Sequence, residues 1–233
     1  MLSGTAREVS PRGIWQAPSV RKYVIMGIQG SGKGTQAQRL AADFDLVHLS
    51  VGDVFRWNVE QHTKLGAQVR RIMAAGKLVD DELVEAIVRQ RLQDHDWNYG
   101  FIVDGFPRNV RQAEFFLESY DIDAVILLEL ADEDVAARVL SRRICAGCGL
   151  DYNVVGRQPH ESEVCATCGG ELVMREDDNP DALAARLRDY HQKTQPIIEL
   201  FERKECVLHI DAKRDIGVIQ SDIRRRLGLS ENP

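Results

Sequence analysis

The chain has 233 residues, of which 44% are apolar and 28% charged, and its formal net charge is −6 at pH 7. This length can bury a full hydrophobic core without disulfides, and the composition excludes a collagen, a low-complexity disordered chain and a coiled-coil rod. No apolar run approaches the about 18 residues of a membrane span, so no membrane association is expected. The acidic balance argues against the broad basic surface of a general nucleic-acid-binding protein.

The first 22 residues differ in charge from the rest of the chain. They contain four basic residues against one acidic residue, and they lack the apolar stretch of a secretory signal peptide. An organellar transit peptide is one interpretation, because such peptides are rich in Arg and poor in acids. We favour a disordered extension on a cytoplasmic protein, since chain termini are commonly poorly ordered.

From residue 23 onward, short apolar strands alternate with amphipathic helices. Strands are expected at 23–26, 46–49, 101–103, 124–130 and 206–210, and helices at 36–44, 53–75, 80–92, 132–143, 181–203 and 215–227. We expect helix 53–75 to break near Gly66, and helix 132–143 to begin with Asp132 as its N-cap. The alternation predicts an α/β fold with a five-stranded parallel sheet, interrupted by a cysteine-rich insertion at 145–174.

A glycine-rich turn follows the first predicted strand. It reads Gly-Ile-Gln-Gly-Ser-Gly-Lys-Gly-Thr from 27 to 35 and leads into a helix, which is the layout of a phosphate-binding loop. In such a loop, backbone N–H groups and the helix N-terminus bind phosphate oxygens. The common pattern places Ser or Thr directly after the lysine, whereas Gly34 intervenes here before Thr35. The alternative is a plain strand-to-helix turn with a solvated Lys33.

Asp104 ends the predicted strand 101–103, at the edge of a parallel sheet where ligands bind. A carboxylate at this place can hold Mg²⁺ through the water molecules of the ion. An Asp-Gly pair is also a common turn, so the interpretation depends on the neighbouring phosphate-binding loop.

Four of the five cysteines form two Cys-x2-Cys pairs separated by sixteen residues. The pairs are Cys145 with Cys148 and Cys165 with Cys168, the spacing of a structural zinc site with four thiolate ligands. Two disulfides and four free thiols are the alternatives. A zinc ribbon can also bind nucleic acid, but residues 145–174 contain one Arg against four acids, so we expect a scaffold. Cys206 lies apart and is expected to be a small buried hydrophobic residue.

Seven segments together resemble the adenylate kinases, in the bacterial long-lid form within the nucleoside monophosphate kinase family. They are GIQGSGKGTQAQRL at 27–40, LSVGDVFR at 49–56, GKLVDDELV at 76–84, DGFPRN at 104–109, RVLSRRIC at 138–145, CGGELVMREDDNPDALAARL at 168–187 and DYHQKTQPI at 189–197. The glycine after Lys33 is typical of this family. The resemblance implies a core of 23–49, 80–143 and 176–233, an acceptor-binding subdomain of 50–79 and a zinc lid of 144–175, with 1–22 outside as an extension.

The resemblance also implies the reaction, which is reversible transfer of the γ-phosphoryl group from Mg-ATP to AMP, giving two ADP. The acceptor phosphate is already ionised at neutral pH, so the site needs no general base. It needs cations that position the phosphates and neutralise the spreading charge. Arginine suits this role because it binds phosphate through two N–H groups and keeps its charge.

Site residues carry over from the family by position. The ATP-binding residues would be Gly30, Ser31, Gly32, Lys33, Gly34, Thr35, Arg138 and Arg142. The AMP-binding residues would be Ser50, Val51, Arg56, Lys77, Val79, Gly105, Arg108, Gln112, Arg175 and Arg186. The catalytic cations would be Lys33, Arg108, Arg138, Arg142, Arg175 and Arg186; Asp53 and Asp104 would face Mg²⁺, and Asp177 and Asp178 would be lid-hinge acids that pair with arginines. Arg138 and Arg142 are expected four residues apart on one helix face.

Two positions, Val51 and Gln29, depart from the family pattern, and a third, Gln112, bears on the choice of acceptor. Val51 replaces the usual Thr, which loses a hydroxyl near the base, and pyrimidine-specific relatives carry a small residue there. Gln112 falls where the family has its adenine-reading glutamine, whose amide can pair with the adenine edge. Gln29 replaces a proline that is common in the loop. We weigh Gln112 above Val51 and predict AMP as the acceptor.

Three hypotheses follow from these residues. The first is a monomeric ATP:AMP phosphotransferase that needs Mg²⁺ and a structural Zn²⁺ and binds no nucleic acid. The second is the same chemistry with a broader or pyrimidine acceptor. The third is a non-catalytic nucleotide-binding regulator or nucleic-acid module.

Overall fold

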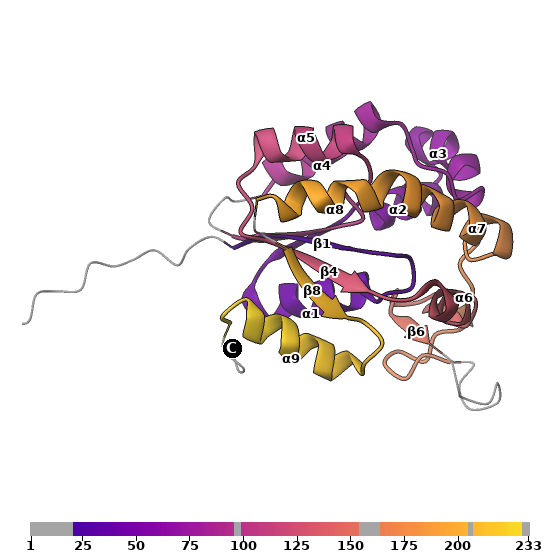
Figure 1. The fold of residues 1–233 in the computed structure, drawn as a ribbon. Coiled ribbons are helices and arrows are strands. Elements are labelled where there is room, and N and C mark those ends of the chain that lie inside the picture. Colours follow the sequence, from indigo (N-terminus) through magenta and orange to yellow (C-terminus); the bar gives the residue numbers. More distant parts are fainter. Residues whose placement is uncertain (1–20, 96–98, 154–163, 205–206, 230–233) are drawn as a thin grey trace, which may run out of the picture.

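The computed structural model describes residues 21–95, 99–153, 164–204 and 207–229. A five-stranded parallel sheet forms the centre, in the order β2-β3-β1-β4-β8 (Figure 1). Its strands are β1 (Lys22–Gly27), β2 (Val47–Ser50), β3 (Phe101–Asp104), β4 (Ala124–Glu129) and β8 (Val207–Asp211). All four neighbouring pairs run parallel. The predicted α/β class and five-stranded sheet are therefore confirmed.

Helices cover both faces of the sheet because successive side chains of a buried strand point to opposite faces. Along β1, Val24 and Met26 pack on one side with α4 (Asp81–Gln93), α5 (Val110–Ser119) and α8 (Gln195–Glu202). Tyr23 and Ile25 pack on the other side with α1 (Lys33–Phe44) and α9 (Ile216–Arg226). The two layers are visible above and below the strands in Figure 1.

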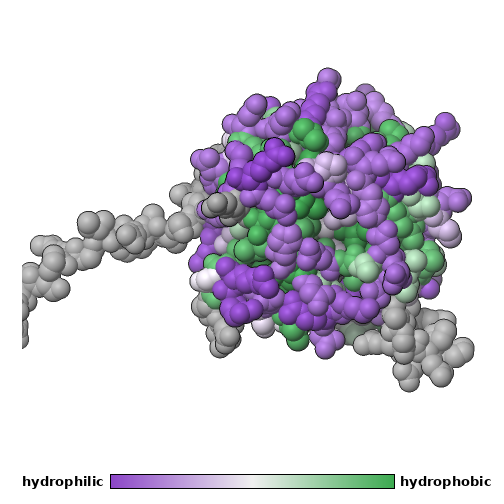
Figure 2. Space-filling view, viewed as in Figure 1, coloured by the Kyte–Doolittle hydropathy of each residue, from purple (hydrophilic) through white to green (hydrophobic). Residues whose placement is uncertain are grey.

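Hydrophilic side chains dominate the face shown in Figure 2, where apolar side chains come to the surface mainly between the two helix layers. No helix in the described ranges is long and apolar enough to cross a membrane.

Two insertions extend from this core. The first is a helical pair, α2 (Val51–Glu60) and α3 (Lys64–Ala74). The second is a three-stranded antiparallel sheet in the order β6-β5-β7, made of β5 (Arg142–Cys145), β6 (Asp151–Asn153) and β7 (Leu172–Val173). Helix α6 (Asp132–Leu140) leads into it, and α7 (Pro180–Asp189) leads out of it.

The predicted two-piece helix over 53–75 is confirmed, but several details of the predicted helices are wrong. Helix 53–75 breaks between Glu60 and Lys64, before Gly66, which lies inside α3. Thr63 caps α3 by accepting a hydrogen bond from the N–H of Gly66, so the cap begins a new helix there.

Helix 132–143 ends at Leu140, and its N-cap is Ala131, with Asp132 as the first helical residue. Arg142 instead starts β5, because this segment pairs with β6 and β7. Arg138 and Arg142 therefore do not share a helix face.

Helix 181–203 is interrupted by a π-helical turn, Tyr190–Thr194, between α7 and α8. A π-turn inserts an extra residue and is frequent at functional sites. The predicted extension falls outside the described residues except for its last two positions, and Cys206 lies outside them as well.

Candidate functional site

A cavity of about 340 Å³ opens at the carboxyl ends of β1, β2 and β3, between the two insertions. This is where open α/β sheets bind their ligands. All the predicted nucleotide and magnesium residues line it except two, Ser31 and Val51. The lining includes eight cations against five carboxylates, in a chain with a net charge of −6; the cations are Lys33, Arg56, Lys77, Arg108, Arg138, Arg142, Arg175 and Arg186, and the carboxylates are Asp53, Asp104, Asp151, Asp177 and Asp189.

The phosphate-binding loop bends sharply between β1 and α1. Gly30 and Gly32 have φ values of +79° and +94°, a region that side-chain-bearing residues rarely adopt. The backbone N–H of Ser31 donates to the carbonyl of Ile28 at 3.2 Å, and its buried side chain has no partner among the described groups. The hydroxyl of Ser31 is therefore buried behind the loop and does not face the cavity.

Lys33 begins α1 and lies in this loop. Its Nζ donates to the carbonyl of Ile28 at 2.8 Å. Burial, together with the nearby positive charges of Arg108, Arg142 and Arg186, lowers the pKa of Lys33 to about 8, although the Asp104 carboxylate raises it. A buried ammonium group among arginines is stabilised by any anion that enters the cavity.

The two candidate magnesium acids have different surroundings. Asp104 ends β3, is 9% exposed and lies in register with Ile25 and Ser50 of the adjacent strands. It is close to the start of α1, since its Oδ2 would be 3.5 Å from a Cβ at Gly34. Asp53 lies in the first turn of α2 and forms an ion pair with Arg56. Burial raises the pKa of Asp53, but the charge and hydrogen bonds of Arg56 outweigh this effect and lower it.

Asp177 and Asp178 lie between β7 and α7 and pair with three of the arginines, as predicted, whereas their role as hinge acids stays a prediction. Asp178, which is 1% exposed, accepts from Arg142 Nε at 2.7 Å and Nη2 at 2.5 Å. Asp177 forms an ion pair with Arg186 and lies 3.9 Å from Arg56 Nη1. These contacts bring Arg56 from α2, Arg142 from β5 and Arg186 from α7 to one place.

Arg108 and Arg175 are two further cations of the site whose pKa values are lowered. Burial and the positive charge of Arg186 lower the pKa of Arg108 to about 10. Burial and the charges of Arg56 and Arg142 likewise lower the pKa of Arg175, whose buried Nε has no partner among the described groups. Arginines crowded together out of water favour the binding of a multivalent anion such as a nucleotide phosphate chain.

The segment of Arg108 is held from three sides. Its backbone N–H donates to Gln112 Oε1 at 2.8 Å, and its carbonyl accepts from Thr194 Oγ1, in the π-turn, at 2.8 Å. Its Nε donates to the carbonyl of Gly105 at 2.7 Å. The Phe106–Pro107 peptide bond between them is cis.

The predicted adenine reader, Gln112, is 2% exposed and lines the cavity. Its Nε2 donates to Asp81 Oδ1 at 2.7 Å, so each end of its amide has one protein partner and keeps one further hydrogen-bonding position for a ligand. The wall beside it is apolar and includes Phe55, Met73, Leu78, Val79 and Val84. A flat base fits such a wall, with the amide at its edge.

Val51 is 4% exposed and belongs to the apolar cluster under α2. Ser50 lines the cavity and caps the same helix by accepting from the N–H of Asp53 at 3.3 Å. The side chain of Val51 is therefore turned into the core, away from the cavity that its neighbour lines.

The cavity also contains residues that sequence reasoning missed. They are Ile216 at the start of α9, Asp151, Tyr152 and Asn153 of β6, and Asp189, Tyr190 and Thr194 around the π-turn. Asp189, Tyr190 and Thr194 offered a signal, because they belong to the segment 189–197 that resembles the family. Ile216 and the residues of β6 lie in segments with no recognisable spacing.

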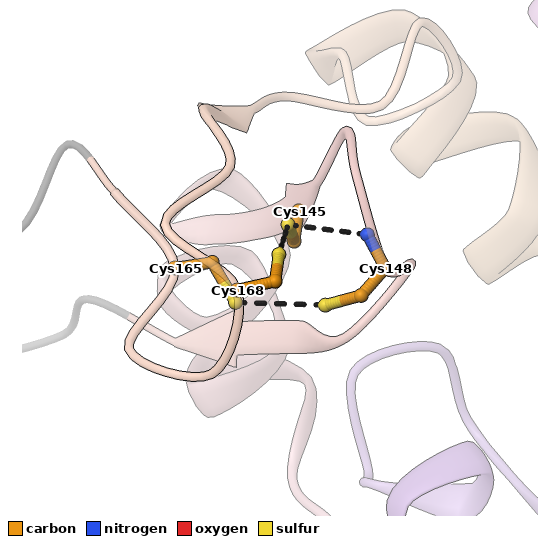
Figure 3. Close-up of side chains that lie close together, drawn as sticks. All are labelled: Cys145, Cys148, Cys165 and Cys168. Carbon is orange, nitrogen blue, oxygen red and sulfur yellow. Dashed lines mark hydrogen bonds between the residues drawn. The ribbon is translucent and has the colours of Figure 1, made fainter.

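The four cysteines of the insertion lie together (Figure 3). Their sulfur atoms are all within 4.8 Å of one another. The distances of 3.3 Å for Cys145–Cys168 and 3.5 Å for Cys148–Cys165 exceed a disulfide bond of about 2.05 Å. They are near the about 3.8 Å between sulfurs in a tetrahedral zinc site with Zn–S bonds of about 2.3 Å.

The backbone around the cysteines also fits a metal. The N–H groups of Gly147 and Cys148 point to Cys145 Sγ at 3.3 and 3.4 Å. A Cβ at Gly170 would come within 2.9 Å of the same sulfur, so this approach requires glycine. The residues present can therefore hold a tetrahedral ion such as Zn²⁺.

Comparison with known proteins is consistent with this geometry. The sequence model of the family described as adenylate kinase matches residues 25–206. An adenylate kinase of Geobacillus sp. is 42% identical over 211 residues, which cover 88% of this chain and 97% of the relative. Those of Bacillus licheniformis and Staphylococcus aureus are 40% and 38% identical over 210 and 205 residues, covering 88% and 86% of this chain and 97% and 95% of the relatives.

Proposed function

The chain belongs to the adenylate kinase family, and on this basis we propose that its cavity transfers the γ-phosphoryl group of ATP to AMP, giving two ADP. The observation that carries this function is the lining of the cavity, in which eight cations face five carboxylates. The phosphate groups of two nucleotides would neutralise this excess of positive charge.

The parts of the chain have separate roles in this proposal. Residues 23–49, 80–143 and 176–233 form the core, 50–79 bind AMP and 144–175 form the lid. ATP phosphates bind the backbone of 30–35, Lys33, Arg138 and Arg142. AMP binds along the apolar wall, with its phosphate at Arg56 and Arg108 and its base near Gln112.

In the transfer step, a phosphate oxygen of AMP attacks the γ-phosphorus in line, and the bond from that phosphorus to the β–γ bridging oxygen breaks. The electron pair stays on the β-phosphate of the leaving ADP, and no proton has to move. Arg175 and Arg186 line the same cavity and would neutralise the charge of the transferring group. Asp104 would hold the water molecules of the Mg²⁺ that accompanies ATP, and this ion would supply further positive charge for the phosphates.

We propose that AMP is the preferred acceptor, because the apolar wall and the Gln112 amide suit adenine. A coupled assay with AMP, GMP, CMP and UMP at fixed Mg-ATP tests this preference. AMP should give the highest kcat/KM, and a faster reaction with CMP or UMP would refute it. Turnover with none of the four would refute catalysis altogether.

Lys33→Ala tests the proposed site within the same assay. It should abolish turnover, since removing a preorganised cation costs a factor of about 10²–10³ or more. Lys204→Ala, at an exposed lysine after α8, is the matched control and should keep the normal rate. A Lys33→Ala enzyme with a near-normal rate would refute the mechanism.

We propose that the four cysteines hold one structural zinc ion. All four positions are taken by protein, so no site for a reactive water remains. Metal analysis should find one zinc per chain, and Cys148→Ser should lose it, whereas Cys206→Ser should keep it. A zinc-free protein with four reactive thiols would refute the site. The cytoplasmic location and the monomeric state stay predictions.

A further inference from the structure

Tyr152, in the lid strand β6, reaches one of the four clustered cysteines. Its hydroxyl oxygen lies 3.1 Å from Cys165 Sγ. The backbone N–H of Ala166 donates to the same oxygen at 3.1 Å. Because the oxygen already accepts from Ala166, the phenolic hydrogen is available to point at the sulfur.

The strand that carries Tyr152 is short. It has three residues and lies at the edge of the lid sheet, where β5 is its only neighbour among the described strands. So short an edge strand is weakly held by its own ladder. The bond from Tyr152 to Cys165 ties it to the second cysteine knuckle, which follows thirteen residues later in the chain.

The two neighbours of Tyr152 on β6 contact the nucleotide site. Asp151 accepts from Arg175 Nη2 at 2.8 Å. Asn153 pairs in register with Arg142 across the ladder and accepts from Ser141 Oγ at 3.0 Å. One three-residue strand therefore contacts the cysteine cluster through its middle residue and the candidate phosphate arginines through its ends.

We propose that Tyr152 is a positioning residue of the metal site, which holds Cys165 in its ligating orientation and thereby anchors β6 beside Arg142 and Arg175. This inference rests on the proposed zinc site. A hydroxyl that donates to a ligating thiolate orients the ligand and stabilises its negative charge, as outer-shell partners of metal ligands commonly do. Arg175 would in turn be held through Asp151, so the metal would support the geometry of phosphate binding from outside the cavity.

The test is Tyr152→Phe, which removes the hydroxyl and keeps the ring. Tyr99→Phe, at a tyrosine that is 53% exposed, is the matched control. Zinc affinity is measured in the full-length protein by competition with a chromogenic chelator. We expect Tyr152→Phe to weaken zinc binding by about 10- to 100-fold, and Tyr99→Phe to leave it unchanged.

A second measurement separates the hydrogen bond from a general loosening of the lid. With Co²⁺ in place of Zn²⁺, the thiolate-to-metal charge-transfer band reports the electron density on sulfur. Loss of a hydrogen bond to Cys165 should move this band to longer wavelength, whereas a loosened lid would only lower its occupancy.

The outcomes distinguish the two proposals. A wild-type protein without zinc would overturn the zinc site and this inference together. A wild-type protein with one zinc, but an unchanged affinity or an unmoved cobalt band in Tyr152→Phe, would overturn the inference alone. A weakened affinity together with a moved band would support it.

Discussion

Gln29 in the phosphate-binding loop donates a hydrogen bond from Nε2 to Asp178 Oδ1, at 3.1 Å and across 149 residues of sequence. The same carboxylate accepts from Arg142, so the loop, the lid strand β5 and the segment before α7 meet at one buried acid. Adenylate kinases commonly have proline at this loop position, and the side chain of proline cannot donate a hydrogen bond. This chain therefore has a direct link between its phosphate loop and the segment that joins β7 to α7.

Gln29→Glu should destabilise the protein at neutral pH, because it replaces a donor to Asp178 with a second carboxylate. Loss of a hydrogen bond to a charged group costs about 1.5–3 kcal/mol, and chemical denaturation at pH 7 would measure the change in the free energy of unfolding. Burial beside Asp178 raises the pKa of the introduced carboxyl above its unfolded value of about 4.3. The penalty is therefore present above the folded-state pKa and disappears as the pH falls to the unfolded value.

Gln68→Glu is the control for this experiment, because Gln68 lies exposed on α3. It should change the free energy of unfolding by less than about 0.5 kcal/mol, both at pH 7 and at the lower pH where the penalty of Gln29→Glu disappears. Equal effects of the two substitutions would mean that the link to Asp178 contributes nothing.

ATP binding should weaken as the pH rises above about 8, the pKa to which burial lowers Lys33. Above this pH, Lys33 of the free protein is mostly neutral. Binding of the phosphates must then be accompanied by the uptake of a proton on Lys33. The Kd for ATP, measured by calorimetry, should rise by up to about tenfold per pH unit until the pKa of the complex is reached. Lys33→Arg should bind more weakly at pH 7 but show no such rise between pH 7.5 and 9.5. A wild-type Kd that is constant over this range would contradict the assignment.

Val51→Thr should leave AMP binding unchanged and lower stability. Val51 is buried in the cluster under α2 and does not line the cavity, so a hydroxyl there meets apolar groups instead of the nucleotide. Burying a hydroxyl without a partner costs about 1–3 kcal/mol. Steady-state assays should show a KM for AMP within about twofold of wild type, since no hydrogen bond is gained.

The matched control is Val110→Thr. Both valines are the first residue of a helix, but Val110 is 47% exposed, so its substitution should be nearly neutral. A tenfold fall in the KM for AMP with Val51→Thr would show that the hydroxyl reaches the base after all.

Gly66→Ala should destabilise the proposed AMP-binding subdomain. A Cβ at this position would come within 2.1 Å of the Asn58 carbonyl oxygen, so α2 and α3 would have to move apart. We expect a loss of about 1–3 kcal/mol in the free energy of unfolding. Gly217→Ala, in α9 with open space around it, should instead gain about 0.5–1 kcal/mol from the helix preference of alanine. Thermal denaturation of both variants would reveal the opposite signs.

Features encoded by neighbouring residues were predictable from the sequence. The phosphate loop occupies nine consecutive residues, and residues 124–128 are all apolar because this part of β4 is buried on both faces. The two cysteine pairs likewise have a spacing that matches one metal ion. Backbone hydrogen bonding repeats over a few residues, so local spacing is enough to indicate these elements.

Other features depend on contacts between distant segments, and only the tertiary structure decided them. Arg142 leaves the predicted helix because its segment pairs with β6 and β7, and it meets Asp178 across 36 residues. The lowered pKa of Lys33 arises from burial and from arginines on other elements. Val51 and Ser50 are neighbours in sequence, yet one faces the core and the other the cavity. The burial and the electrostatic surroundings of a side chain depend on all the segments that pack around it. A local sequence pattern therefore cannot reveal them.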